Sequence, residues 1–153
     1  MSVHFEKINA KLLSNLKKEY PKQLKEIFKQ DKCEIDESFL GFVETYYYLS
    51  LLIPKHYTVI DLGCCCALQS YYFINHKQYI GVDSSTNKRL KLTNTEHLYC
   101  SIKFYLNLWD KKDTDEIFAI CSYVPIDTKE IREKFKNVYT YYPAGNSILS
   151  EEK

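Results

Sequence analysis

Two aspartates near the ends of short apolar runs carry the most informative chemistry of this sequence. Asp61 lies in the run 58–63, and Asp83 ends a second run twenty residues after Gly63. In an open α/β sheet, ligands bind beyond the carboxyl ends of the strands. A glycine at such an end lets the backbone approach a nucleoside closely, and a carboxylate on the next strand can accept hydrogen bonds from both hydroxyls of a ribose. This spacing therefore predicts a nucleoside site.

The stretch resembles the class I S-adenosylmethionine-dependent methyltransferases, whose first motif is D-x-G-x-G-x-G and whose second strand ends in an acidic residue. The resemblance covers residues 58–83 well and extends loosely to 142. It implies that Asp61 holds the methionine amino group, directly or through water, that Gly63 is the first loop glycine, and that Asp83 binds the ribose. It also implies S-adenosylmethionine as the cofactor, while the methyl acceptor stays unidentified.

The same resemblance supplies further candidates. If residues 102–110 form the third strand and its exit, then Asn107 and Asp110 are candidates for contact with the adenine amino group. Ser122 and Tyr123 follow the fourth strand, where amino methyltransferases often carry an acidic residue or Asn before Pro-Pro and an aromatic. They are candidates for substrate contact, but neither is an evident base. Methyl transfer from a sulfonium needs mostly in-line positioning, so the lack of a base does not exclude this reaction. No catalytic residue is assigned.

The cofactor loop departs from the motif at its second and third glycines, which are Cys65 and Ala67 here. A side chain in left-handed geometry costs about 1–2 kcal/mol and adds atoms where the cofactor should approach. Either the loop is rebuilt, or it keeps its conformation and these side chains partly fill the cofactor pocket, with Cys65 as a candidate residue of that site. A third interpretation is that residues 64–68 begin a helix under the sheet, with the small cysteines filling the core.

The first third of the chain is expected to be helical. Apolar residues recur at three- and four-residue spacing over 8–28, with Pro21 as a break. Asp36 or Ser38 caps a further helix, which ends at Pro54.

From residue 57 onward, strands alternate with helices, which predicts right-handed crossovers and a mainly parallel sheet. The expected strands cover 58–63, 79–83, 102–108, 117–124 and 138–142, and the expected helices cover 67–75, 84–92 and 129–135. With the resemblance, this gives an α/β fold: a Rossmann-like, methyltransferase-type sheet of about five strands with an N-terminal helical segment. One domain is expected, made of the helical segment 1–55, the core 56–145 and a tail 146–153.

The methyltransferase sheet has seven strands, and this chain ends soon after its expected fifth. An edge strand near 139–141 would then be open to a homodimer or a protein partner, unless the N-terminal helices cover it. The alternative hypothesis is therefore a non-catalytic methyltransferase-fold protein that acts as a protein-interaction module or inhibitor, encoded by a phage or mobile element. The substituted glycines and the basic N-terminus motivate it as well.

Residues 1–32 carry eight lysines against four acidic residues, although the whole chain has a net charge of only +1. A solvated helix face is the expected explanation. Nucleic acid is the weaker alternative, because this stretch holds no arginine to grip phosphate.

Six cysteines include three consecutive ones, which are poorly placed to bridge each other, and no C-x-x-C pair suggests zinc. Histidines and acidic residues are scattered without the spacing of metal ligands, so no metal is expected. No secretory signal is recognisable, and the longest apolar run, 46–53, is far shorter than the roughly 20 residues that span a bilayer. Reduced thiols in a cytoplasmic protein without membrane contact are expected.

Overall fold

The computed structural model describes residues 2–30, 37–109, 113–121 and 128–140. The helices are α1 Ser2–Glu19, α2 Pro21–Phe28, α3 Glu37–Leu52, the 3₁₀ helix η1 Leu68–Phe73, α4 Ile102–Leu108 and α5 Thr128–Lys134. The strands are β1 Thr58–Leu62, β2 Gln78–Val82, β3 Thr95–Leu98, β4 Ile117–Cys121 and β5 Asn137–Thr140.

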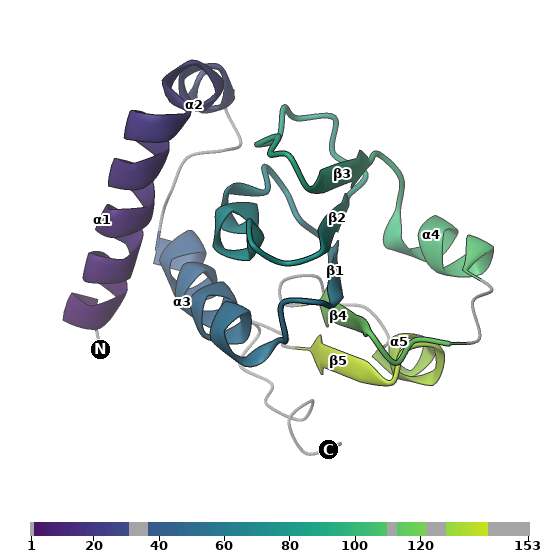
Figure 1. Cartoon of the computed structure of the whole chain (residues 1–153). Coiled ribbons are helices and arrows are strands. Elements are labelled where there is room, and N and C mark those ends of the chain that lie inside the picture. Colours follow the sequence, from purple (N-terminus) through teal and green to yellow (C-terminus); the bar gives the residue numbers. More distant parts are fainter. Residues whose placement is uncertain (1, 31–36, 110–112, 122–127, 141–153) are drawn as a thin grey trace.

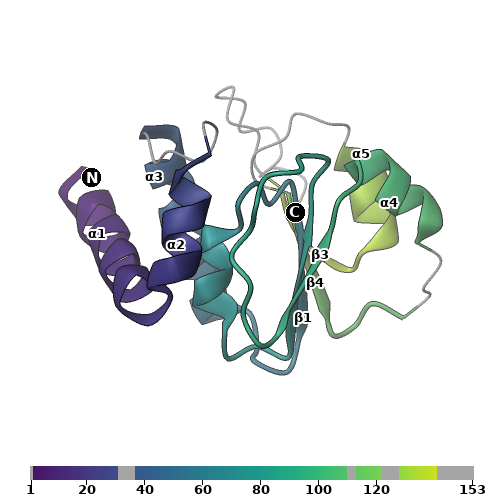
Figure 2. The same ribbon diagram turned by 90° about the horizontal axis from the view of Figure 1, so that it is seen from above.

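The five strands form one sheet in the order β3-β2-β1-β4-β5, and every neighbouring pair is parallel. Helices α1, α2, α3 and η1 cover one face, and α4 and α5 cover the other (Figures 1 and 2). The strand order reverses between β1 and β4, which is where doubly wound sheets bind ligands. The predicted α/β, Rossmann-like architecture with an N-terminal helical segment is confirmed.

The prediction of the third strand is wrong. Residues 102–108 form helix α4, and the strand is Thr95–Leu98. Ser101 starts the helix because its side chain accepts a hydrogen bond from the Phe104 amide (3.0 Å). The alternating pattern of this segment also fits a helix, since Ile102 and Leu106 are four residues apart and bury one face.

The helix expected over 84–92 is also absent: this part of the described chain is an irregular segment between β2 and β3. It packs against the N-terminal helices, because Leu90 shares an apolar cluster with Leu16 of α1 and Leu24 of α2. Cys66 belongs to the same cluster. The helical segment therefore covers both the loop after β1 and the segment after β2. No helix in the described ranges has the length and apolar character needed to cross a bilayer.

Two histidines are held as neutral rings. His76 Nε2 donates to the Ile53 carbonyl (3.0 Å), and His97 Nε2 donates to the Leu90 carbonyl (2.8 Å). A carbonyl only accepts, so each ring carries its proton on Nε2, and each Nδ1 has no hydrogen-bond partner within the described ranges. Burial lowers the pKa of both rings below the ordinary value of 6.5.

Acidification below pH 6.5 is therefore expected to lower the melting temperature. Because the folded-state pKa is depressed, the unfolded chain binds protons first, and stability present above pH 6.5 is lost as the pH falls through the folded pKa. Thermal unfolding across pH measures this. The double variant His76→Gln, His97→Gln should show a flatter profile. Equal profiles for the double variant and the native protein would contradict the assignment.

Candidate functional site

The loop after β1 keeps the backbone that the glycine motif requires. Gly63 has φ = 90°, Cys65 has φ = 54° and Ala67 has φ = 59°. These are the three glycine positions of the motif, and Cys65 and Ala67 are the only non-glycine residues with positive φ in the part of the chain that the structure describes. The loop is therefore neither rebuilt nor the start of a helix, since η1 begins only at Leu68. Each side chain in left-handed geometry costs about 1–2 kcal/mol.

Hydrogen bonds to the end of β2 hold this loop. The amides of Gly63 and Cys64 both donate to the Val82 carbonyl (2.7 and 3.2 Å). The next amide, of Cys65, donates to the Asp83 carboxylate (2.8 Å). The tip of β2 and the loop after β1 thus form one unit, and these bonds together offset the backbone strain.

The side chains of the loop are packed into the protein. Ala67 is 1% exposed and lies in an apolar cluster with Tyr46, Phe73 and Tyr79. Cys64 fills the space beside Gly81, where an added Cβ would lie 2.8 Å from the Cys64 sulfur. A side chain at position 81 would therefore force the Cys64 thiol to move.

The thiols of the loop are not arranged for nucleophilic chemistry. Burial raises the pKa of the Cys64 thiol, and burial also raises that of the Cys65 thiol, so both stay protonated at neutral pH. Cys64, Cys65, Cys100 and Cys121 are free thiols. Cys66 is disulfide-bonded, which corrects the expectation of fully reduced cysteines. The described residues contain no group of three or more potential metal ligands.

Asp61 is completely buried and accepts three hydrogen bonds from side chains of the protein. Tyr46 OH donates to Oδ1 (2.7 Å) and Gln69 Nε2 to Oδ2 (2.9 Å). Tyr79 OH donates a third, short bond to Oδ2. These donors come from α3, η1 and β2, so Asp61 ties three elements to the centre of the sheet.

Burial raises the pKa of Asp61, while the three donors lower it, and the net direction is upward. The charge of Asp83 raises it slightly further, which reflects how near the two carboxylates are. For Asp61 to bind a methionine amino group, one of its three donors has to release it. Its role in cofactor binding stays a prediction.

Asp83 follows β2 and is half-buried. Its Oδ2 accepts from the Cys65 amide and its Oδ1 accepts from the Ser85 amide (2.9 Å). The Asp83 amide donates to the Leu98 carbonyl at the end of β3 (3.2 Å). The two aspartates therefore lie at the same edge of the sheet, next to the loop, as the sequence predicts. Each Asp83 oxygen retains a lone pair for a further donor such as a ribose hydroxyl.

Arg89, which sequence reasoning did not single out, is bound at this edge. It is only 3% exposed, and its guanidinium donates to four backbone carbonyls. These belong to Gly81 (3.2 Å), Asp83 (2.7 Å), Ser85 (3.2 Å) and Leu98 (2.9 Å). The guanidinium carbon also lies 4.0 Å from the centre of the Tyr99 ring. An arginine soon after an acidic strand end is the only signal that the sequence offers for it.

An apolar pocket of about 340 Å³ lies at the exit of β3. Four of its seven lining residues are aromatic; the lining is Leu98, Tyr99, Cys100, Phe104, Tyr105, Leu108 and Trp109. Burial raises the pKa of Tyr105 to about 12, so its hydroxyl remains neutral. Because the Leu98 carbonyl accepts from the Asp83 amide, the pocket begins beside the expected ribose site.

Of the other predicted site residues, the structure describes only Asn107. Asn107 is exposed on helix α4 rather than at a strand exit, so the reason for placing it at the adenine is lost, although no observation tests its contact with a ligand. Asp110, Ser122 and Tyr123 lie outside the described residues.

Comparison with known proteins identifies no family: no protein-family model and no curated protein matches the chain. One solved structure that resembles it is SMU.1697c of Streptococcus mutans, assigned as a methyltransferase and in complex with S-adenosylhomocysteine (SAH). The TM-score is 0.47 and the identity 14%, over 71% of this chain and 77% of that one. Another is coclaurine N-methyltransferase bound to N-methylheliamine and SAH, with TM-score 0.41 and 15% identity over 80% of this chain and 49% of that one. Both likenesses concern the fold alone.

Proposed function

We propose that this protein binds the nucleoside half of S-adenosylmethionine at the carboxyl edge of β1, β2 and β3, as a methyltransferase-like protein whose acceptor is unidentified. The observation that carries the proposal is the loop backbone. Positive φ at residues 63, 65 and 67 is retained even where the side chains disfavour it. Strain of this kind persists where the surrounding structure requires that conformation, and it clusters at ligand sites.

The residues around the loop have the chemistry that a nucleoside needs. Asp83 would accept the ribose hydroxyls, and the aromatic pocket beside it would take the apolar faces of the base. When bound, the cofactor supplies an electrophilic methyl group, and this chain contributes position rather than a base. Asp61 would contact the methionine end only after releasing one of its donors.

Isothermal titration with S-adenosylmethionine and with SAH tests the proposal. Asp83→Asn is expected to weaken binding about tenfold or more, since a hydrogen bond to a charged group contributes about 1.5–3 kcal/mol. Glu116→Gln removes a carboxylate at the opposite end of the sheet, before β4, and should bind as the native protein does. Melting curves of both variants separate loss of binding from loss of folding. No heat and no thermal stabilisation with either ligand would exclude nucleoside binding.

A second function is favoured by the saturated Asp61 and by the side chains at two glycine positions. Under it, the fold serves as a non-catalytic protein-interaction module or inhibitor that has lost the cofactor. The partner, or a second copy of the chain, would pair with the sheet edge at β5. The same titration separates the two functions. If neither nucleoside binds, sedimentation of the purified protein and stoichiometric capture of a partner are the measurements that follow.

A further inference from the structure

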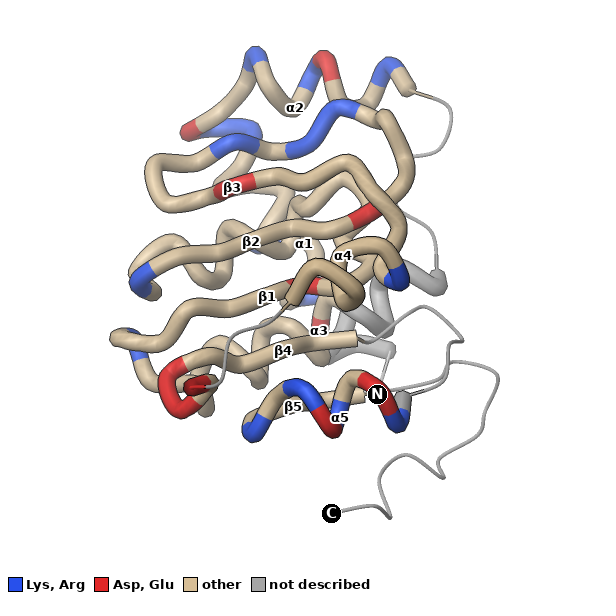
Figure 3. The backbone as a smooth tube through the Cα atoms, turned by 90° about the vertical axis from the view of Figure 1, so that its right-hand side faces the viewer, with Lys and Arg blue, Asp and Glu red and all other residues tan. Residues whose placement is uncertain are grey.

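Two lysine-rich segments that are far apart in the sequence form one surface. Helix α2 carries Lys22 and Lys25, and Lys29 follows its last residue. The segment before β3 carries Lys88 and Lys91. All five are exposed; we call them the lysine surface. Figure 3 shows basic positions on α2 and on the neighbouring segment above β3. The sequence alone indicates only the basic character of residues 1–32, without the second segment.

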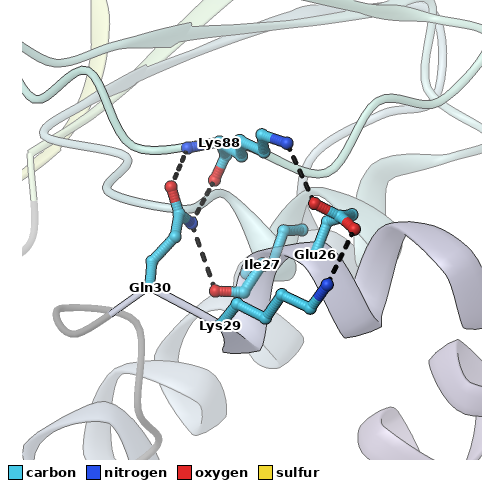
Figure 4. Close-up of polar contacts among 5 residues, drawn as sticks. All are labelled: Glu26, Ile27, Lys29, Gln30 and Lys88. Atoms are coloured by element: carbon cyan, nitrogen blue, oxygen red, sulfur yellow. Dashed lines mark hydrogen bonds and ion pairs between the residues drawn. The ribbon is translucent and has the colours of Figure 1, made fainter.

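Two glutamine side chains hold the segments together. The Gln23 amide donates to the Lys91 carbonyl (2.9 Å) and accepts from the Lys91 amide (2.8 Å). Gln30 forms the same two-way pair with the backbone of Lys88 (Figure 4). Each pair resembles one step of a β-ladder and uses only the lysine backbone. The ammonium group of Lys91 is therefore left at the surface, whereas that of Lys88 pairs with Glu26 (3.0 Å). These hydrogen bonds therefore fix the positions of the two lysine-rich segments relative to each other.

Positive charge is in excess on this surface. The only acidic residue within α2 and residues 88–91 is Glu26, which pairs with Lys88 (3.0 Å) and Lys29 (3.4 Å). Within the described ranges, the side chains of Lys22, Lys25 and Lys91 make no ion pair. The whole chain has a net charge of only +1, so the rest of the sequence is acidic on balance.

We propose that the lysine surface binds the phosphodiester backbone of a nucleic acid, without reading its sequence. Lys22, Lys25 and Lys29 are spaced for one side of the helix, while Leu24 and Ile27 are buried against the core. Lysines act as point charges on phosphate, and the surface has no exposed arginine for bidentate contact with guanine.

Two other classes of partner, an anionic membrane and a protein, fit the lysine surface less well. A membrane-binding helix needs an apolar face to insert beneath the headgroups, and in α2 that face is already buried by Leu24 and Ile27. A protein partner needs a large apolar anchor at the centre of the interface. Among exposed large apolar residues, only Phe28 belongs to α2, at 36% exposure, and it lies at the end of the helix.

Fluorescence anisotropy with labelled single-stranded RNA, single-stranded DNA and duplex DNA of about 20 nucleotides, at about 20–200 mM KCl, tests the proposal. Binding should be independent of sequence. The logarithm of the affinity should fall linearly with the logarithm of the salt concentration. Five phosphate contacts imply a slope of roughly −3.5 for single strands and −4.5 for duplex DNA. No binding at the lowest salt, or a slope near zero, would overturn the proposal, and so would equal or tighter binding to vesicles of anionic phospholipid.

A charge-matched pair of variants locates the contact. The double variant Lys25→Glu, Lys91→Glu reverses the charge of two lysines of the lysine surface that make no ion pair within the described ranges. It should weaken binding at low salt at least about tenfold. Lys55→Glu with Lys77→Glu makes the same change in net charge at exposed positions before β1 and β2, and it should weaken binding far less. Melting curves confirm that both variants fold, and the neutral pair Lys25→Gln, Lys91→Gln should give an intermediate loss. Equal losses from both charge reversals would place the contact elsewhere and refute the proposal.

Discussion

Replacing Asp61 with alanine is expected to destabilise the protein by about 2–6 kcal/mol, because two buried tyrosine hydroxyls lose this acceptor and each such loss costs about 1–3 kcal/mol. The carboxylate is fully buried and accepts from Tyr46, Gln69 and Tyr79. Without it, the hydroxyls of Tyr46 and Tyr79 lose their bonds to this carboxylate, and a cavity remains beside β1. Gln69 keeps its bond to the Cys64 carbonyl (3.0 Å), so the loss falls mainly on the tyrosines. Urea unfolding measures the change.

A double-mutant cycle with Tyr46→Phe separates the bond from the cavity. In the native background, Tyr46→Phe should cost about 1 kcal/mol, as for an ordinary hydrogen bond. In the Asp61→Ala background it should cost less, or even stabilise, because the hydroxyl has already lost its acceptor. Asp115→Ala removes an exposed carboxylate that pairs with Lys136 (2.5 Å) and should change little. Additive effects at Asp61 and Tyr46 would contradict the network.

The strands that the sequence predicts best are those with continuous apolar runs. β1, β2 and β4 are buried over most of their length, and such strands carry a strong local signal. β3 is different: Thr95-Glu96-His97-Leu98 lies at the sheet edge and has no fully buried residue. The sequence favours 102–108 as the third strand instead, because alternation and helical spacing coincide there. The error follows from edge exposure, which weakens the pattern that identifies a strand.

The candidate site is predictable in position but not in detail. The spacing of Asp61, Gly63 and Asp83 places them at one sheet edge, and the structure brings them there. The local sequence does not show which side chains form hydrogen bonds with these residues. The donors to Asp61 come from positions 8 to 18 residues away, and they depend on how α3 and η1 pack. The positive φ of Ala67 likewise depends on the bonds that tie the whole loop to β2.

The second large effect is expected at Arg89. Arg89→Met, which keeps much of the apolar volume, should destabilise the protein by about 3 kcal/mol, since hydrogen bonds to a charged group contribute about 1.5–3 kcal/mol each and are not additive. The guanidinium binds carbonyls at the ends of both β2 and β3, so its loss leaves the segment after Asp83 without its main anchor. Arg89→Lys should rescue little, because the three donors of an ammonium share one atom and cannot span the same carbonyls.

Hydrogen exchange distinguishes this anchoring role from general packing. In Arg89→Met, the amides of residues 83–99 should exchange faster, while those of β4 and β5 should keep their protection. Arg132→Met changes an arginine on helix α5 and should leave the exchange of residues 83–99 unaltered.

Desolvation of the guanidinium opposes the stabilisation that its hydrogen bonds provide. A buried cation is costly, and replacing buried ions by apolar residues sometimes stabilises a protein. The four carbonyls and the Tyr99 ring offset that cost at Arg89. A more stable Arg89→Met protein with unchanged exchange would show that desolvation costs more than these contacts contribute. The strands β2 and β3 would then hold this edge of the sheet without the arginine.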